Sequence, residues 1–243
     1  MNEPYLVLRL EAHLMSFGGI AVDNRGVEMP FPPPSLVAGL LGNALGYDRS
    51  EAAKLQSLQN RLRYALRIDR EGAPISDFQT ADISGQDRAW TTSGVPETRA
   101  GGSDTYKGKH LRYRDLHADR AVTLVLTLAP ADEPPTLEHL AQALNTPARP
   151  LFIGRKHCLP SSPLCLGIIH ADSAWQALHA TPLAEAARQQ ANLRIFLPAD
   201  INPAGAPPEF RLHRVSGLRQ GSSHIHGGTQ SWHEYVAPLS EVQ

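Results

Sequence analysis

One segment limits the folds open to this sequence more than any other. Residues 70 to about 112 form a long connection between two strand-like segments. The connection is rich in Gly, Thr, Ser, Asp and Arg, and has few apolar side chains beyond Phe78, Ile83, Trp90 and Val95. An irregular connection of this length is uncommon in a compact domain, and it is usually functional or disordered. We therefore expect a regular scaffold with one long excursion.

The segments on either side of the excursion have the periodicities of strands and helices. Residues 5–12 alternate apolar and polar side chains, which predicts a half-buried strand. Ser35 is a suitable N-cap for a short helix that ends near Gly46. Applied along the chain, such patterns predict strands at 5–12, 63–69, 121–128, 150–154 and 163–170, and helices at 35–46, 51–62 and 137–145.

The order of these elements predicts the fold class. With the second helix as an addition, it is strand, helix, strand, strand, helix, strand, the order of an α+β, ferredoxin-like (RRM-like) domain. We expect this domain at residues 1–170, with the excursion at about 70–118 between its second and third strands. Residues 171–243 are expected to form a smaller, strand-rich C-terminal lobe. Its expected elements are helices around Trp175 and over 184–191, and strands near 193–197, 209–215 and 234–239.

Charge and composition exclude several classes of protein. The formal net charge is −1, so any surface for nucleic acid must be local. Arg9, Glu11 and His13 interrupt the N-terminal apolar run, which argues against a signal peptide or a membrane helix. The only cysteines are Cys158 and Cys165, which suits a reducing compartment. We expect a cytoplasmic protein that has no membrane partner.

A local basic surface is expected where the excursion returns to the scaffold. Residues 105–120 gather cations and rings, namely Lys107, Lys109, Arg112, Arg114 and Arg120 with Tyr106, His110, Tyr113 and His117. Cations at this spacing in an extended chain can follow a phosphate backbone, and rings such as Trp90 and Tyr106 can stack on unpaired bases. The alternative is a solvated hairpin whose arginines pair with Asp115 and Asp119. Composition alone does not decide between the two.

The same segment carries side chains suited to RNA cleavage without a metal ion. Such cleavage needs one group that activates a 2′-hydroxyl and another that stabilises the scissile phosphate. Tyr106, Lys109 and His110 supply these chemical types. No feature of the sequence brings the three side chains together, so catalysis stands as an alternative hypothesis.

A second basic spot lies between two of the expected strands. Gly154 frees the backbone there, and Arg155 and Lys156 can hold a phosphate or form an ordinary basic turn. The spacing of Cys158 and Cys165 matches no standard zinc motif, and no phosphate loop or dinucleotide fingerprint is present. We expect neither a metal site nor a cofactor.

Five stretches of the sequence, in this order, resemble one protein family. They are YLVLRLEAHLMSFGG, FPPPSLVAGLLGNALG, DFQTADI, HLRYRDLHADRAVTLVL and PLFIGRKHCLPSSPLCLG. They are similar to the Cas-five family of repeat-associated RNA-binding proteins, which includes the CasD subunits of type I-E CRISPR Cascade. The resemblance covers roughly residues 4 to 170 and fades after residue 171.

The resemblance implies a ferredoxin-like RNA-recognition domain with a long β-hairpin thumb between strands 2 and 3, where the excursion lies. Members of this family grip the 5′ handle of the CRISPR RNA (crRNA), cap the CasC backbone, contact the large subunit CasA and act with the other Cascade subunits in antiviral defence. The type I-E subunit is a non-catalytic holder, whereas its type I-C relative is a ribonuclease that uses tyrosine, lysine and histidine. The flanking motifs fit type I-E, so catalysis is not carried over to Tyr106, Lys109 and His110.

The resemblance also implies RNA-binding residues. Phe17, Gly18 and Gly19 stand at the family's aromatic-glycine turn, and backbone N–H groups near Ser35 can receive a phosphate at a helix start. The family often has threonine and a basic residue before this helix, and here the sequence is PPPS, which leaves only the backbone donors. On the thumb we expect RNA contacts at Trp90, Tyr106, Lys107, Lys109, Arg112 and Arg114. On the body we expect them at Phe17, Gly18, Gly19, Ser35, Arg155 and Lys156.

Three hypotheses about function remain open at this level. The first is a non-catalytic subunit that holds the crRNA handle and assembles with Cascade. The second is a metal-independent endoribonuclease that processes CRISPR precursor RNA. The third is a protein scaffold without RNA contact, whose basic patch meets an acidic partner.

Overall fold

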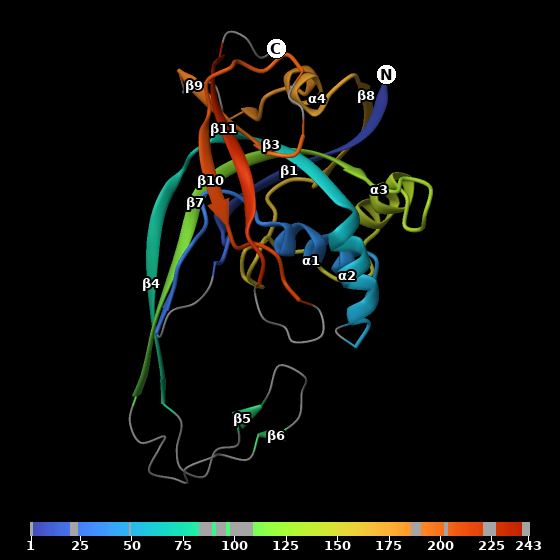
Figure 1. Ribbon diagram of the computed structural model, residues 1–243. Coiled ribbons are helices and arrows are strands. Elements are labelled where there is room, and N and C mark those ends of the chain that lie inside the picture. The colour runs from blue at the N-terminus through green and yellow to red at the C-terminus, as the bar shows by residue number, and fades with distance from the viewer. Residues whose placement is uncertain are drawn as a thin grey trace.

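The computed structural model is an α+β structure built on one large, mostly antiparallel sheet, with helices on its faces (Figure 1). It describes residues 2–19, 24–48, 50–82, 89–90, 96–97, 109–185, 191–201, 204–220 and 227–239. Within these residues, no helix is both long and apolar enough to cross a lipid bilayer.

Four strands from the first two-thirds of the chain form the middle of the sheet. They are β1 (Glu3–Met15), β3 (Leu62–Arg70), β7 (Lys109–Leu128) and β8 (Cys165–Ala171). Their order across the sheet is β3-β7-β1-β8, and every neighbouring pair is antiparallel. The predicted sequence of strand, helix, strand, strand, helix, strand is confirmed, with α1 (Pro34–Ala44) and α2 (Ala52–Arg61) after β1 and α3 (Leu137–Asn145) after β7.

Both faces of the sheet are buried, and the alternation of side chains along β1 explains how. Leu6, Leu8 and Leu10 point to one face, where they pack with side chains of α1, α2 and α3. Tyr5 and Val7 point to the opposite face, where they pack with α4 (Ala174–Ala180). A strand with period-2 alternation can serve two separate cores only if both faces are covered, which is the arrangement found.

Two local predictions were wrong. Residues 150–154 were expected to form a strand, but they lie in a loop, because the N–H and C=O of Ile153 bond to Cys158 and Ser16 across turns rather than to a neighbouring strand. The first helix begins at Pro34 with Pro33 as its N-cap, so Ser35 is not the cap. Proline suits the first helical turn because its missing N–H would have no helical partner there.

A long arm extends from the sheet. The first part of the twenty-residue β7 pairs with β4 (Ala73–Asp82), while its second part pairs with β1 and β3 in the body (Figure 1). Asp119 and Gly72 both have positive φ, 51° and 65°, and they lie where the two parts of β7 meet. Two short strands, β5 (Ala89–Trp90) and β6 (Pro96–Glu97), pair with each other, and β2 (Arg25–Gly26) runs parallel to β7 at the base of the arm.

The C-terminal strands extend the same sheet. β9 (Asn192–Pro198) pairs with β3, and β11 (Gln230–Pro238) lies between β9 and β10 (Arg211–Val215). These strands and α4 agree with the elements expected after residue 171. The helix expected over 184–191 falls largely on 186–190, outside the described residues.

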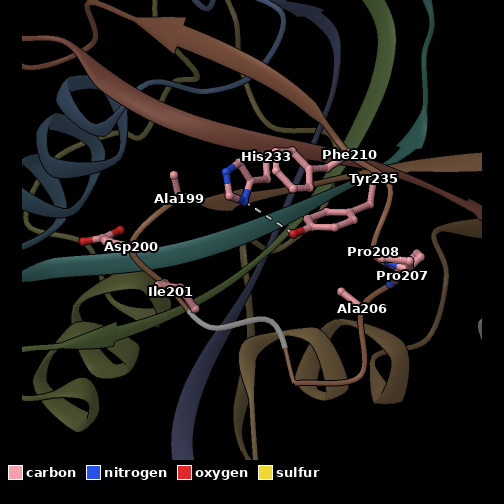
Figure 2. Close-up of a pocket in the computed structure, with 9 residues that line it drawn as sticks. All are labelled: Ala199, Asp200, Ile201, Ala206, Pro207, Pro208, Phe210, His233 and Tyr235. Carbon is pink, nitrogen blue, oxygen red and sulfur yellow. Dashed lines mark hydrogen bonds between the residues drawn. The ribbon is translucent and has the colours of Figure 1, made fainter.

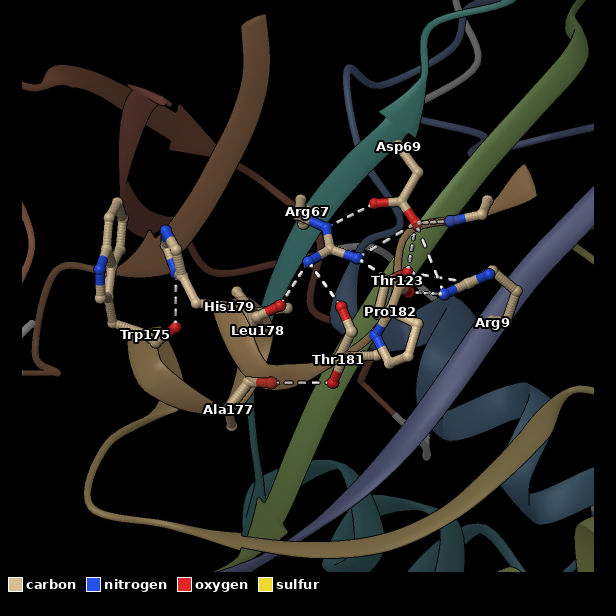
Figure 3. Close-up of polar contacts among 11 residues, drawn as sticks. Arg9, Arg67, Asp69, Thr123, Trp175, Ala177, Leu178, His179, Thr181 and Pro182 are labelled. Carbon is tan, nitrogen blue, oxygen red and sulfur yellow. Dashed lines mark hydrogen bonds and ion pairs between the residues drawn. The ribbon is translucent and has the colours of Figure 1, made fainter. Parts of the chain in front are cut away.

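A buried ion network ties the loop after α4 to the sheet (Figure 3). The side chains of Arg67 and Asp69 are both fully buried, with Arg67 Nε 2.6 Å from Asp69 Oδ1. Arg67 also donates to the carbonyls of Leu178 and Thr181, and Asp69 accepts from the Thr123 hydroxyl at 2.7 Å. Because both charged side chains are buried and bonded to each other and to the loop after α4, the network acts as a fixed internal joint.

Candidate nucleic-acid interface

A groove of about 1090 Å³ brings together five of the residues expected to bind RNA. They come from three separate segments and are Gly18, Gly19, Ser35, Arg155 and Lys156. The groove runs between the turn after β1, the first helix and the loop around residue 155. The cations on its wall make it suited to a polyanion.

The backbone around Gly154 fixes where Arg155 lies. Gly154 has a φ of +89°, and a Cβ at this position would lie 1.8 Å from the carbonyl oxygen of Ser16. The Ser16 N–H donates to the Ile153 carbonyl at 3.1 Å. Only glycine permits both this conformation and this close approach. The loop is therefore held against the end of β1, and Arg155 follows it into the groove.

Two guanidinium groups meet over Gly26. Arg114 Nη1 and Arg155 Nη2 lie 3.1 and 3.2 Å from the position that a Cβ would occupy at Gly26. Nη1 of Arg155 is buried and has no hydrogen-bond partner among the described residues. Two like charges so close repel each other, and an unbonded guanidinium N–H costs free energy. An anion in the groove that contacts the exposed part of Arg155 would offset this repulsion, so the groove wall at Arg155 has the chemistry of a phosphate site.

One carboxylate, Glu28, lies beside this pair. Its side chain is only 7% exposed, and it accepts hydrogen bonds from the Ser16 hydroxyl at 2.7 Å and from the Phe17 N–H. Glu28 Oε1 is 3.6 Å from Arg155 Nη2, which is an ion pair without a hydrogen bond. Burial raises the pKa of Glu28 to about 7, against the opposing effect of its hydrogen bonds and of Arg155.

His117 lies on the other side of Glu28 and is neutral. Its Nδ1 accepts a hydrogen bond from Arg120 Nη1 at 3.0 Å, and its Nε2 lies 3.1 Å from the Met29 carbonyl. Because an arginine can only donate, Nδ1 must be the acceptor and Nε2 must carry the proton. Burial, together with the charge of Arg120, lowers the pKa of His117 to about 4. His117 therefore contributes no positive charge near neutral pH.

Two of the expected body residues do not have the roles predicted for them. The Phe17 ring is completely buried and lies 4.9 Å from the ring of His117, so it supports the site from below and cannot stack on a base. The Ser35 N–H donates to the Gly217 carbonyl at 3.0 Å, so it is not free to receive a phosphate. RNA contact by the Ser35 side chain, in the groove wall, stays a prediction.

The two faces of the arm differ in chemistry. Arg112 and Arg114 lie on one face, because residues two apart on a strand point the same way. On the other face the rings of Phe78 and Tyr113 are 5.1 Å apart, and Phe78 is 52% exposed. The guanidinium of Arg25 lies 5.6 Å from the centre of the Tyr113 ring. One face of the arm thus carries Arg112 and Arg114 beside Asp77, and the other carries the ring pair beside Arg25.

Several expected arm contacts cannot be placed. Tyr106 and Lys107 lie outside the described residues, as do the side chains of Trp90 and His110. Lys109 is described and exposed at the start of β7. The three residues of the catalytic alternative are therefore not brought together by any described contact.

No pattern in the sequence indicates that Glu28, Gly26 or Arg25 belongs to this site. Glu28 was one acid among many, and its importance depends on contacts with β1, β7 and a distant loop. Arg149 also lines the groove, but its guanidinium is held by Asn43, Asp48 and Tyr47. In the described part of the chain, no group of three His, Cys, Asp or Glu side chains is placed to hold a metal ion.

A family model described as CRISPR-associated protein (Cas_Cas5) matches residues 5–229. The chain belongs to the Cas5 family. This is the Cas-five family that the sequence motifs resemble, and that prediction is confirmed. The match extends beyond the expected limit near residue 170 and includes β9 and β10, so the Cas5 similarity is not confined to the body and the arm.

Individual Cas5-like proteins agree with this assignment. The chain is 28% identical over 176 residues to the CRISPR system Cascade subunit CasD of Escherichia coli (strain K12), covering 72% of this chain and 75% of that protein. A solved structure titled "Crystal structure of Cas protein" matches with a TM-score of 0.58 and 27% identity, over 98% of this chain and 97% of the other. A chain of a "CRISPR RNA-guided surveillance complex" has a TM-score of 0.66 at 20% identity, over 97% and 92% of the two chains, and supports the fold.

A second hollow, of about 440 Å³, lies beside the C-terminal strands of this Cas5 protein (Figure 2). Phe210 stacks on His233 there, with ring centres 3.9 Å apart, and Tyr235 lies next to them. None of the residues expected to bind RNA lines this hollow. The groove beside Gly26 is therefore the candidate site.

Proposed function

We propose that this Cas5 protein is a non-catalytic subunit of a type I-E Cascade complex that binds the 5′ handle of the crRNA and caps the CasC backbone. One observation carries the proposal. Arg114 of the arm and Arg155 of the body meet over Gly26, at the edge of a groove lined by four more of the expected residues. Arm and body would then grip a single phosphate backbone between them.

The same proposal names the fold in finer terms. Residues 1–170 would be a ferredoxin-like RNA-recognition domain, with β4 and the first part of β7 as its thumb. Residues 171–243 would be a smaller C-terminal lobe whose strands extend the sheet. The order β3-β7-β1-β8 supports this, because it places the first and third strands of the β-α-β-β-α-β unit side by side in the centre.

The arm also carries aromatic and apolar side chains. Unpaired RNA bases stack on aromatic side chains, and Phe78, 52% exposed, pairs with Tyr113 on the arm face opposite Arg112 and Arg114. Besides the rings, the apolar side chains of Ile75 and Leu111 are exposed on the arm, at 39% and 41%. Apolar side chains on an extended hairpin suit a protein neighbour, here the CasC subunit, while CasA would contact the body.

The first experiment combines binding and cleavage. Purified protein is mixed with labelled cognate repeat RNA and EDTA, and the mixture is run on a native gel beside a denaturing gel. We expect a shifted complex that weakens steeply with salt and contains intact RNA. We also expect Arg114→Ala to weaken the shift.

The endoribonuclease and scaffold hypotheses predict different results on these gels. Cleavage at one position that is lost in His110→Ala would establish the endoribonuclease and contradict the proposal. A protein that shows no preference for RNA under any salt condition would be a scaffold. An unchanged affinity in Arg114→Ala would remove the arm–body junction from the site while leaving RNA binding intact.

A further inference from the structure

We propose that Glu28 is a positioning residue that holds Arg155 at the groove in the free protein and takes up a proton when an RNA phosphate replaces it as the partner of Arg155. This inference rests on the proposed function. It begins from the geometry of Glu28, a buried carboxylate whose Oε1 is 3.6 Å from Arg155 Nη2. That distance is too long for a hydrogen bond, so Arg155 is attracted to Glu28 but is not bonded to it.

The carboxylate itself is fixed by other groups. The Ser16 hydroxyl and the Phe17 N–H donate to its two oxygens, and both donors belong to the end of β1 and its turn. Neither donor carries a charge. Glu28 therefore keeps its position whether or not Arg155 stays beside it. It can thus remain in place when an RNA phosphate becomes the partner of Arg155.

Among the charged and titratable groups around Glu28, Arg155 is the cation that forms an ion pair with it. Those that face it are Arg155 and Cys158 of the loop, and Asp115, His117 and Arg120 of β7. His117 is neutral, and Arg120 is paired with Glu71 at 3.0 Å. Asp115 raises the pKa of Glu28, whereas Arg155 lowers it.

A bound phosphate changes this balance. A phosphate in the groove would lie against Arg155, which lines it, and near Glu28, whose hydrogen-bond partner Ser16 also lines it. The phosphate would draw on the charge of Arg155 and repel the charge of Glu28, and both effects favour the protonated carboxyl. Glu28 already has a pKa of about 7 because of burial. RNA binding near neutral pH would therefore take up a proton, and affinity would rise as the pH falls.

The test is the affinity for labelled repeat RNA at pH 6, 7 and 8 at constant ionic strength. For the unmodified protein we expect the dissociation constant to increase about three- to tenfold from pH 6 to pH 8, as for a site coupled to one titrating group. Glu28→Gln keeps an acceptor oxygen for the Phe17 N–H, can donate its amide N–H to the Ser16 hydroxyl oxygen, and cannot ionise. It should bind at pH 8 about as tightly as the unmodified protein binds at pH 6. Asp132→Asn, in an exposed loop, removes the same charge and should keep the pH dependence.

A calorimetric measurement keeps the inference testable even if Glu28→Gln folds poorly. Titration of the unmodified protein with RNA at pH 7, in two buffers of different ionisation enthalpy, should show uptake of a fraction of one proton. Arg155→Gln should lose this uptake.

Each contrary result has a separate meaning. Equal pH dependence in the unmodified protein and in Glu28→Gln, or no proton uptake, would overturn the inference and leave the proposed function standing. Weaker binding of Glu28→Gln at every pH would also overturn it, because Glu28 would then only organise the site. No RNA binding at any pH would overturn the proposed function itself.

Discussion

Two clusters of arginines and acids lie in this protein, and they differ in how completely their arginines are bonded. In the cluster of Arg67 and Asp69, both side chains are fully buried, and the arginine is bonded to a carboxylate and to backbone carbonyls (Figure 3). In the cluster of Arg114, Arg155 and Glu28, Arg155 is 23% exposed and has a buried nitrogen without a partner among the described residues. The first cluster is closed, and the second is open to a ligand.

The difference separates two uses of the same residue types. A buried charge that is fully paired adds rigidity, and its loss leaves the partner charge uncompensated. A charge that is incompletely paired keeps part of its interaction energy for a ligand, at some cost to the stability of the free protein. The bonding of a cluster, rather than its composition, thus distinguishes a structural joint from a binding site.

The largest effect should come from the closed cluster. Asp69→Ala should lower the free energy of unfolding by about 3–5 kcal/mol, because it leaves Arg67 buried and unpaired. Chemical denaturation measures this directly, with Asp132→Ala as a control that should change stability by less than about 0.5 kcal/mol. A loss below about 1 kcal/mol for Asp69→Ala would mean that the closed cluster is not a joint.

The open cluster should respond to acid through His117. Folding lowers the pKa of His117 from its usual 6.5 to about 4. The stability it contributes is present above pH 6.5 and is lost as the pH falls toward 4. Between pH 7 and pH 4, the free energy of unfolding of His117→Gln should therefore fall by about 1–3 kcal/mol less than that of the unmodified protein. Urea denaturation at a series of pH values measures this difference, and parallel curves would contradict it.

Arg155 should matter for RNA more than for folding. Arg155→Gln should weaken RNA binding about tenfold and reduce the salt dependence by the equivalent of one phosphate contact. Arg149→Gln is the matched comparison, because Arg149 lines the same groove but is already bonded to Asn43 and Asp48. Its loss of affinity should be smaller. The distinction between bonded and unbonded arginines fails if the order of the two variants is reversed.

The smallest effect should come from Gly26→Ala. The added methyl group would lie 3.1–3.2 Å from both guanidinium groups and push them apart. We expect RNA affinity to fall about threefold. For scale, a tenfold fall in affinity corresponds to about 1.4 kcal/mol of binding free energy. Gly227→Ala is the control, because a Cβ there meets no atom of the described residues within 4 Å. Equal affinities for the two variants would show that the approach of Arg114 and Arg155 is not required.

Much of the scaffold was predictable because its signals are local. Alternation predicts β1 and the body part of β7, and helical periodicity predicts α3. The apolar stretch at 150–154 misled this reasoning, because burial without a strand partner gives the same pattern. The prediction of Ser35 as N-cap was wrong for a related reason. The helix already begins at Pro34, one residue before Ser35.

The site was predictable only in part, and for a physical reason. Gly154, Arg155 and Lys156 could be found because glycine next to cations is a local signal. The approach of Arg114 to Gly26, where Arg155 also lies, depends on the parallel pairing of β2 with β7, which joins residues nearly ninety positions apart. No periodicity within a segment reports such a pairing, so the role of Gly26 emerges only in three dimensions.

The length of β7 has a mechanical consequence. One continuous strand of twenty residues belongs to the arm at one end and, at the other, to the centre of the sheet between β1 and β3. A force applied to the arm is therefore transmitted into the centre of the sheet, through the junction at Asp119 and Gly72. The described part of the arm is a lever rather than a tether, and whatever it grips has its direction set by the core.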